Sequence, residues 1–222
     1  MMSQRLDRQL VLSPAPATMN DAVLRATYDS IMEVGVRRTT LADVARRAGV
    51  SRMTVYRKYD DLSRLLSALL TVELGAIFET AIEDARDLPH ARAHLAHLVA
   101  STCGALTAHP VFARVLSLDP EVLLPLIVDR IGSTQRNALE LNVEMIKSGQ
   151  LPKGDGSIRP GDPDVMALAI LMAGQSFVFS SRAIATADPL GHIFPEIEIM
   201  TSRYLEPSSD EKKTSSRKRA KK

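Results

Sequence analysis

The stretch Leu41–Leu62 constrains the fold of this chain more than any other part of the sequence. It reads LADVARRAGVSRMTVYRKYDDL and places Ala45, Gly49 and Val55 at offsets of four and then six residues. Two short helices that cross closely need a small residue at the crossing, a turn residue that tolerates positive φ, and an apolar side chain in the angle between them. The spacing therefore predicts a helix-turn-helix.

Residues suited to helix caps lie on both sides of the turn. Thr40 precedes an apolar pattern of helical period, and Ser51 follows directly after the turn. Threonine and serine at these positions can accept hydrogen bonds from free N–H groups of the first helical turn. We therefore expect a first helix that starts after Thr40 and ends at Gly49, and a second helix over residues 52–58.

The second helix has an outward face that is polar and basic. Its residues are Arg52, Met53, Thr54, Tyr56, Arg57 and Lys58. Arginine and lysine bind phosphates, a guanidinium can read guanine, and a threonine methyl group can contact thymine. No acidic residue occurs between Val44 and Tyr59, whereas a merely solvated helix usually mixes Glu with Lys. An αα-hairpin that happens to contain Gly leaves this face unexplained, so the pattern favours DNA binding.

Charge is distributed unevenly along the chain. Residues 1–66 hold eleven basic and seven acidic side chains, a net charge of +4. Residues 67–207 hold ten basic and seventeen acidic side chains, and residues 208–222 hold seven and two, so the whole chain reaches +2. The basic N-terminal part predicts a polyanionic partner, and the acidic centre predicts another role.

The rest of the chain also has helical patterns. Hydrophobic residues make up 45%, aromatics only 4%, and Trp is absent, a composition suited to a core of aliphatic residues and methionine. Five further helices are predicted: Ala91–His109, Pro110–Leu118, Pro120–Gly149 with a kink near Pro125, Asp164–Ala185 and Phe194–Leu205. The last of these also allows a short strand, and we favour the helix. The predicted fold class is all-α.

Four regions are predicted in chain order. Residues 1–19 read as a flexible N-terminal arm, 20–66 as a three-helix domain that contains the helix-turn-helix, and 67–205 as a larger helical domain. Residues 206–222 read as a disordered basic tail. The first half of Asp164–Ala185 is apolar on every side, so we expect its own domain and a second subunit to cover it.

The stretch Thr39–Leu66, TTLADVARRAGVSRMTVYRKYDDLSRLL, resembles the N-terminal domain of TetR/AcrR-type transcriptional regulators. The resemblance covers about residues 20–69 by motif, and the other helices by length and pattern. It implies a homodimer whose recognition helices enter major grooves of an inverted-repeat DNA operator, and a C-terminal helical domain that binds a small-molecule effector.

The resemblance also implies a role for each site residue. Thr40 would cap its helix and touch a phosphate. Arg52, Met53, Thr54 and Arg57 would face the bases, while Ser51, Tyr56 and Lys58 would hold the DNA backbone. One position departs from the family pattern, because Leu62 stands where a lysine is usual, and Arg64 is the nearest possible substitute.

Other functional classes find little support in the sequence. His90, His94 and His97 have a spacing that could place three imidazoles on one face, but no acidic or Cys partner is near, so we expect surface or pocket-lining histidines and no metal. Motifs of nucleotide-binding loops, nucleophile elbows and zinc proteases are missing, so we expect neither an enzyme nor a cofactor. Without an uninterrupted run of about 18 apolar residues we expect no membrane span, and the single Cys103 is expected to be buried and inert in a reducing cytoplasm.

The functional hypothesis is a sequence-specific DNA-binding transcriptional regulator. A small, largely apolar effector would release this repressor from its operator. Two alternatives remain: a ligand-independent architectural DNA-binding protein, and a helical ligand-binding protein without operator specificity.

Overall fold

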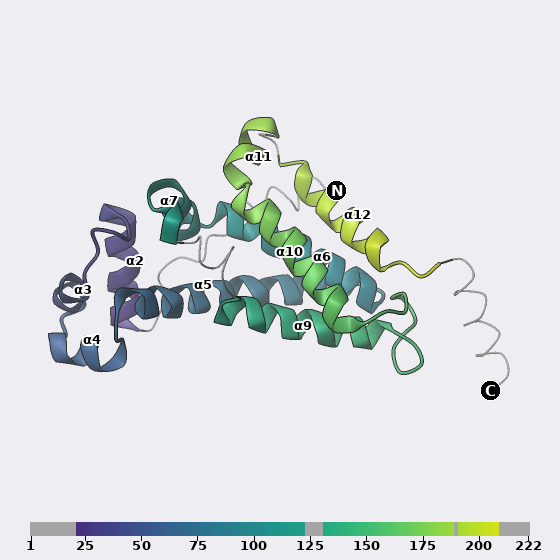
Figure 1. Cartoon of the computed structure of the whole chain (residues 1–222), viewed down its shortest axis with the longest axis horizontal. Coiled ribbons are helices and arrows are strands. Elements are labelled where there is room, and N and C mark those ends of the chain that lie inside the picture. Colours follow the sequence, from purple (N-terminus) through teal and green to yellow (C-terminus); the bar gives the residue numbers. More distant parts are fainter. Residues whose placement is uncertain (1–20, 123–130, 189–190, 209–222) are drawn as a thin grey trace. The chain divides into compact units, whose positions relative to one another are not determined.

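The computed structural model describes residues 21–122, 131–188 and 191–208, and every regular element in them is helical. The elements are α2 (Ala22–Val34), α3 (Leu41–Ala48), α4 (Arg52–Lys58), α5 (Leu62–Ala85), α6 (Ala91–Ala108), α7 (Pro110–Leu118), the 3₁₀ turn η2 (Pro120–Val122), α9 (Ser133–Gly149), α10 (Pro163–Phe179), α11 (Ser181–Ala187) and α12 (Ile193–Leu205). The all-α prediction is confirmed (Figure 1). The predicted arm, 1–19, and residues 209–222 of the predicted tail lie outside the described residues.

The chain divides into two compact units. One combines residues up to 78 with residues 104–134, and the other combines residues 79–103 with residues from 135 onward. The first unit therefore holds α2, α3, α4 and α7, while α9 to α12 belong almost wholly to the second. Helices α5 and α6 contribute to both units. Residue 66, near which the sequence predicts a domain boundary, lies within the continuous helix α5.

Helix α2 starts and ends as its local sequence requires. Asp21 is its N-cap, with Oδ1 accepting hydrogen bonds from the backbone N–H of Val23 (2.8 Å) and of Leu24 (3.3 Å). Asn20, which directly precedes this cap, lies outside the described residues. The helix ends at Gly35, which has φ 83° and ψ 171°, a conformation open almost only to glycine.

Within the first unit, α7 is tied to the turn that follows α2. The carboxylate of Asp119, at the end of α7, accepts a hydrogen bond from the backbone N–H of Val36 at 2.8 Å. Asp119 is 4% exposed, so this bond satisfies polar groups that water cannot reach. A Cβ atom on Gly35 would lie 2.9 Å from Asp119 Oδ2, so both its backbone conformation and its surroundings require glycine.

A buried ionisable pair joins α5 to the corner between α6 and α7. His109 Nε2 lies 2.7 Å from Glu73 Oε2, and the two residues are 3% and 6% exposed. Burial raises the pKa of the nearby Tyr28 hydroxyl, and the charges of Glu73 and Asp29 raise it further. The pair links the two segments, and removing either partner would leave the other buried without this contact.

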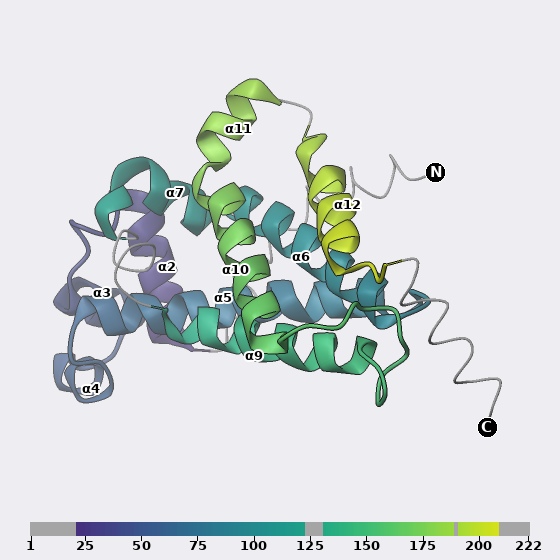
Figure 2. The ribbon, with the colours of Figure 1, turned by 45° about the vertical axis from the view of Figure 1, so that its right-hand side comes forward.

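The second unit is built around an aliphatic core. Its buried members come from α6, α9, the loop after α9, α10 and α12: Ala91, Leu95, Val143, Ile146, Ile158, Met166, Ala167, Ile170 and Leu205. Figure 1 and Figure 2 show α10 and α12 running against α6, with α11 connecting them at one end. Cys103 is buried here, and burial raises the pKa of its thiol to about 12, which agrees with the expected inert side chain.

Two predicted helices differ in the structure. The expected helix Pro120–Gly149 is interrupted, because Ile131–Gly132 is not helical. The expected kink near Pro125 lies outside the described residues. Glycine costs about 1 kcal/mol in a helix interior, so Gly132 is a natural break. The expected helix Asp164–Ala185 ends at Phe179 and resumes as α11, and nothing in its local sequence marks that break. The helical alternative for Phe194–Leu205 is confirmed by α12.

Helix α5 is long and apolar enough, by length and composition alone, to cross a membrane. A window of 18 of its residues has a mean hydropathy of 1.7. No uninterrupted apolar run signals this helix in the sequence, because polar residues such as Glu73 interrupt it. Core helices of globular proteins meet the same criterion.

Replacing Gly35 with alanine should lower the free energy of unfolding by about 1–3 kcal/mol, because the left-handed backbone there is strained for any other residue. Gly75 is the matched control, since it is helical and nothing lies within 4 Å of a Cβ placed on it. Gly75→Ala should raise stability by about 0.5–1 kcal/mol. Urea denaturation at one protein concentration measures both, and equal effects of the two substitutions would contradict the conformational requirement for glycine at position 35.

Candidate nucleic-acid interface

The turn between α3 and α4 has the geometry that the sequence predicts. Gly49 lies in the left-handed region, with φ 68° and ψ 26°, and the backbone N–H of Val50 donates to the carbonyl of Ala45 at 3.0 Å. No atom lies within 4 Å of a Cβ placed on Gly49, so its backbone conformation, and not a lack of space, favours glycine.

The contact between the two helices is made by the small residues expected from their spacing. Val44, Ala45 and Val55 are all fully buried, at 0% exposure. Val55 is the single buried side chain of α4. The packing of α4 on the domain therefore depends on one valine seated against the small side chains of α3.

Both predicted caps are present. Thr40 Oγ1 accepts a hydrogen bond from the backbone N–H of Asp43 at 3.1 Å and donates to the carboxylate of the same residue at 2.6 Å. Ser51 Oγ accepts from the backbone N–H of Thr54 at 3.1 Å. Because α4 has only seven residues, its first turn depends on the Ser51 cap.

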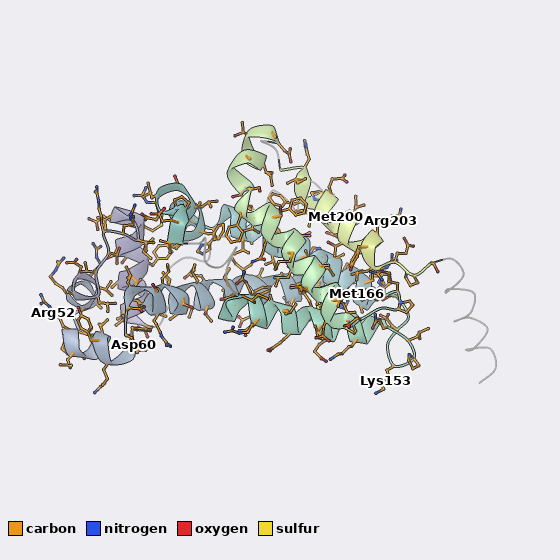
Figure 3. The ribbon with its side chains drawn as sticks, viewed as in Figure 1. Arg52, Asp60, Lys153, Met166, Met200 and Arg203 are labelled. Atoms are coloured by element: carbon orange, nitrogen blue, oxygen red, sulfur yellow. The ribbon has the colours of Figure 1, made fainter. Side chains whose placement is uncertain are left out.

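The outward face of α4 is exposed over its whole length. Met53 and Tyr56 are 75% and 49% exposed, unusually high for large side chains with apolar atoms. The guanidinium groups of Arg52 and Arg57 make no hydrogen bond or ion pair with any other residue that the structure describes. Figure 3 shows Arg52 at the edge of this domain, pointing away from the other helices. The helix thus offers two free guanidinium groups, a thioether chain and a phenol.

The hydroxyl of Thr54 is already engaged. Thr54 Oγ1 lies 2.8 Å from Ser51 Oγ, so the two hydroxyl groups share a hydrogen bond at the start of α4. The methyl group of Thr54 is then the part of this side chain left for contact with a base.

Lys58 has an intramolecular partner that the sequence does not reveal. Its Nζ donates to Asp21 Oδ2 at 2.5 Å and lies 5.3 Å from the centre of the Tyr59 ring. The hydrogen bond to Asp21 raises the pKa of the Lys58 ammonium. Burial raises the pKa of the Asp21 carboxyl, but the bonds from Lys58 and the α2 N–H groups outweigh burial and lower it. Asp21 is thus a residue of this surface that sequence reasoning missed, since 37 positions separate the pair.

Several other cations of the domain are paired. Arg46 contacts Asp43 at 3.4 Å, and the guanidinium of Arg47 binds Glu33. Arg64, the possible substitute for the lysine missing at Leu62, lies 3.5 Å from Asp60.

The three histidines of the possible metal site have separate partners. His90 Nδ1 accepts from the backbone N–H of Ala93 at 3.1 Å, and His94 Nε2 lies 2.7 Å from the Leu88 carbonyl. His97 lies 3.3 Å from a carboxylate oxygen of Glu198 on α12. Within the part of the chain that the structure describes, no three His, Cys, Asp or Glu side chains gather closely enough to hold a metal ion.

Comparisons with known proteins agree with this geometry. The sequence profile of the bacterial regulatory proteins of the tetR family matches residues 23–69. A helix-turn-helix transcriptional regulator of Mycobacterium bovis, itself uncharacterised, is 30% identical over 196 residues, which span 88% of this chain and 99% of the relative. The chain belongs to the tetR family. Its helix-turn-helix is therefore a DNA-binding element of a transcriptional regulator.

Solved structures show a shared fold over most of the chain. The regulator FadR from Bacillus subtilis, crystallised in complex with stearoyl-CoA, has a TM-score of 0.60 at 16% identity, covering 83% of this chain and 98% of that one. A protein of unknown function from Rhodococcus sp. RHA1 also has a TM-score of 0.60, at 22% identity, covering 84% and 94%. At these sequence identities, the comparisons show that the proteins share a fold with this chain.

Ser51→Ala should lower the free energy of unfolding by about 0.5–2 kcal/mol, because it removes the cap of α4. Ser51→Asp should restore stability, since aspartate caps equally well, but should weaken DNA binding by placing a negative charge at the start of the recognition helix. Denaturation and DNA titration measure the two effects. Ser63→Ala, at an exposed position of α5, is the stability control, and a similar loss there would contradict the role of the cap.

Proposed function

We propose that this TetR-family protein is a homodimeric, cytoplasmic repressor that binds an inverted-repeat operator and leaves it when a small, largely apolar effector binds. The proposal assigns DNA binding to residues 20–66 and effector binding with dimerisation to residues 67–205. It assigns no catalytic step and no cofactor to the chain.

The exposed face of α4 is the observation that carries the proposal. A helix that buries a single valine and exposes two unpaired guanidinium groups is well suited to enter a major groove. An arginine can donate two hydrogen bonds to O6 and N7 of guanine, and an apolar group such as the Met53 side chain suits the thymine methyl.

The proposed docking divides the site residues into two groups. Arg52, Met53, the methyl group of Thr54 and Arg57 face the bases. Thr40, Ser51, Tyr56 and Lys58 contact the sugar–phosphate backbone, which positions the helix without reading sequence. All eight residues are exposed, which such contacts require.

Two exposed apolar strips in the second unit support dimerisation. On α10 the strip consists of Val165, Leu168 and Met172, at 62%, 40% and 42% exposure. On α12, Ile199 and Met200 are 52% and 44% exposed. The exposed apolar residues of α10, which stand at helical spacing, and those of α12 are suited to packing against the same helices of a second copy.

The composition of the second unit supports an apolar effector. Its buried cluster is wholly aliphatic or thioether in character, and Leu139 and Met145 pack against it. Methionine adapts its shape readily to a bound apolar molecule. To change operator affinity 5- to 150-fold, an effector needs to prefer the released state by only about 1–3 kcal/mol.

Selection of genomic fragments by the purified protein tests the proposed function. We expect an inverted repeat whose half-sites are centred about 10 base pairs, or a multiple of this, apart. A screen for release would follow, with acyl-CoA esters among its first compounds because FadR of Bacillus subtilis was crystallised with one.

Each alternative function has its own outcome. Weak, sequence-independent binding, with a dissociation constant of about 10⁻⁴–10⁻⁶ M, would overturn the operator proposal and favour a helical ligand-binding protein. A specific site from which no compound releases the protein would favour a ligand-independent architectural role.

The two kinds of DNA contact should respond differently to substitution. Tyr56→Phe should weaken binding by a similar factor on every DNA sequence, because it removes a backbone contact. Arg57→Ala should cost about 1–3 kcal/mol and relax the preference at one base position. Titration of the selected operator and its single-base variants measures both. Arg86→Ala, just after the end of α5, is the charge control, and unchanged affinity in both recognition-helix variants would contradict the docking.

Leu168→Glu should weaken dimerisation by about 3–5 kcal/mol, because it buries an unpaired carboxylate from each protomer. Ile82→Glu is a matched control, since Ile82 is a similarly exposed aliphatic residue, at 47%, on α5. Sedimentation equilibrium of both variants and the wild type gives the association constants. If both glutamate variants dimerise like the wild type, α10 is not the dimer surface.

A further inference from the structure

The last residue of the recognition helix is held by a carboxylate from another helix. Lys58 Nζ and Asp21 Oδ2 are 2.5 Å apart, at the end of α4 and the start of α2. Their side chains are 54% and 30% exposed, so the pair lies at the surface of the domain. A DNA phosphate that reaches Lys58 therefore meets an ammonium that already has an anionic partner.

The two carboxylate oxygens of Asp21 have separate tasks. Oδ1 accepts the hydrogen bonds from Val23 and Leu24 that cap α2. Oδ2 accepts the bond from Lys58. Asparagine caps helices as well as aspartate does, but its amide nitrogen cannot accept from an ammonium. Asp21→Asn therefore separates the capping of α2 from the binding of Lys58.

We propose that Asp21 competes with the DNA backbone for Lys58, so that docking replaces the Lys58–Asp21 ion pair with a Lys58–phosphate contact. The proposal rests on the proposed function, in which Lys58 holds the backbone. Lys58 could in principle bridge both anions, but a phosphate at that distance would lie close to the Asp21 carboxylate and be repelled by it. Exchange of one anion for the other avoids this repulsion.

The competition affects the part of the binding energy that does not depend on sequence. Phosphate contacts act equally on operator and non-operator DNA. Asp21 therefore lowers the affinity for both by the same factor and leaves the preference between them unchanged. Its effect is to shift the regulator from both kinds of DNA toward the unbound state by that factor.

Titration of wild-type and D21N protein with the selected operator, and with a random duplex of equal length, tests the proposal over a range of salt concentrations. D21N should bind both duplexes about two- to fivefold more tightly, the range expected for losing an exposed ion pair. Lys58 contacts the phosphate in both proteins, so the slope of log affinity against log salt should steepen by less than about 0.9, the value for one phosphate contact, and only because the wild-type Asp21 carboxylate freed by docking takes up a cation.

Two controls separate this competition from the long-range repulsion between any carboxylate of the domain and the DNA. Asp61 is a matched position, because its Oδ1 caps α5 through the backbone N–H of Arg64 at 2.8 Å and it does not contact Lys58. D61N removes the same charge from the same domain and should change affinity less than D21N. In a K58Q background, D21N should have no further effect, because the competing cation is gone.

Three results would overturn the inference. An effect of D21N that persists in K58Q, or that D61N reproduces, would assign it to the long-range repulsion between the carboxylate and the DNA. Weaker DNA binding by D21N, with unchanged thermal stability, would mean that the pair positions α4 instead. A wild-type protein that shows no preference for its selected site would overturn the proposed function itself, a result that needs no variant.

Discussion

The close contact between α3 and α4 is the constraint on which the DNA-binding part of the structure depends. Helices of eight and seven residues are too short to persist alone in water, so packing and caps must hold them. Val44, Ala45 and Val55 supply the packing, and Gly49 permits the turn that brings them together. Any larger side chain at Ala45 would separate the helices and change the direction in which α4 projects.

The first unit contains further contacts, outside the three N-terminal helices α2, α3 and α4, that fix the arrangement of the DNA-binding part. Asp119 fixes the turn after α2 from the end of α7, and His109 fixes α7 to Glu73 of α5. Both are buried polar contacts, which are costly to leave unpaired and therefore define one arrangement. Helix α7 lies far beyond the helix-turn-helix in the sequence, but it belongs to the same compact unit.

The sequence predicts local features well because each has a local physical cause. The caps at Thr40 and Ser51, the turn at Gly49 and the buried Val55 all follow from residues within a few positions of one another. The Lys58–Asp21 pair and the Asp119 contact could not be predicted, because they join residues far apart in sequence whose side chains are equally suited to solvent. The break after Phe179 also has no local signal, and tertiary packing overrides the helical pattern there.

The single buried side chain of α4 has a consequence for how such a regulator can evolve. Because Val55 is the only buried residue of the recognition helix, exposed residues such as Arg52, Met53 and Arg57 can change with little effect on folding. New target sequences are then within reach of single substitutions that leave stability intact, and gene duplication can yield paralogues that differ in target sequence but share one scaffold. The sparse anchoring of this helix makes its sequence preference evolvable.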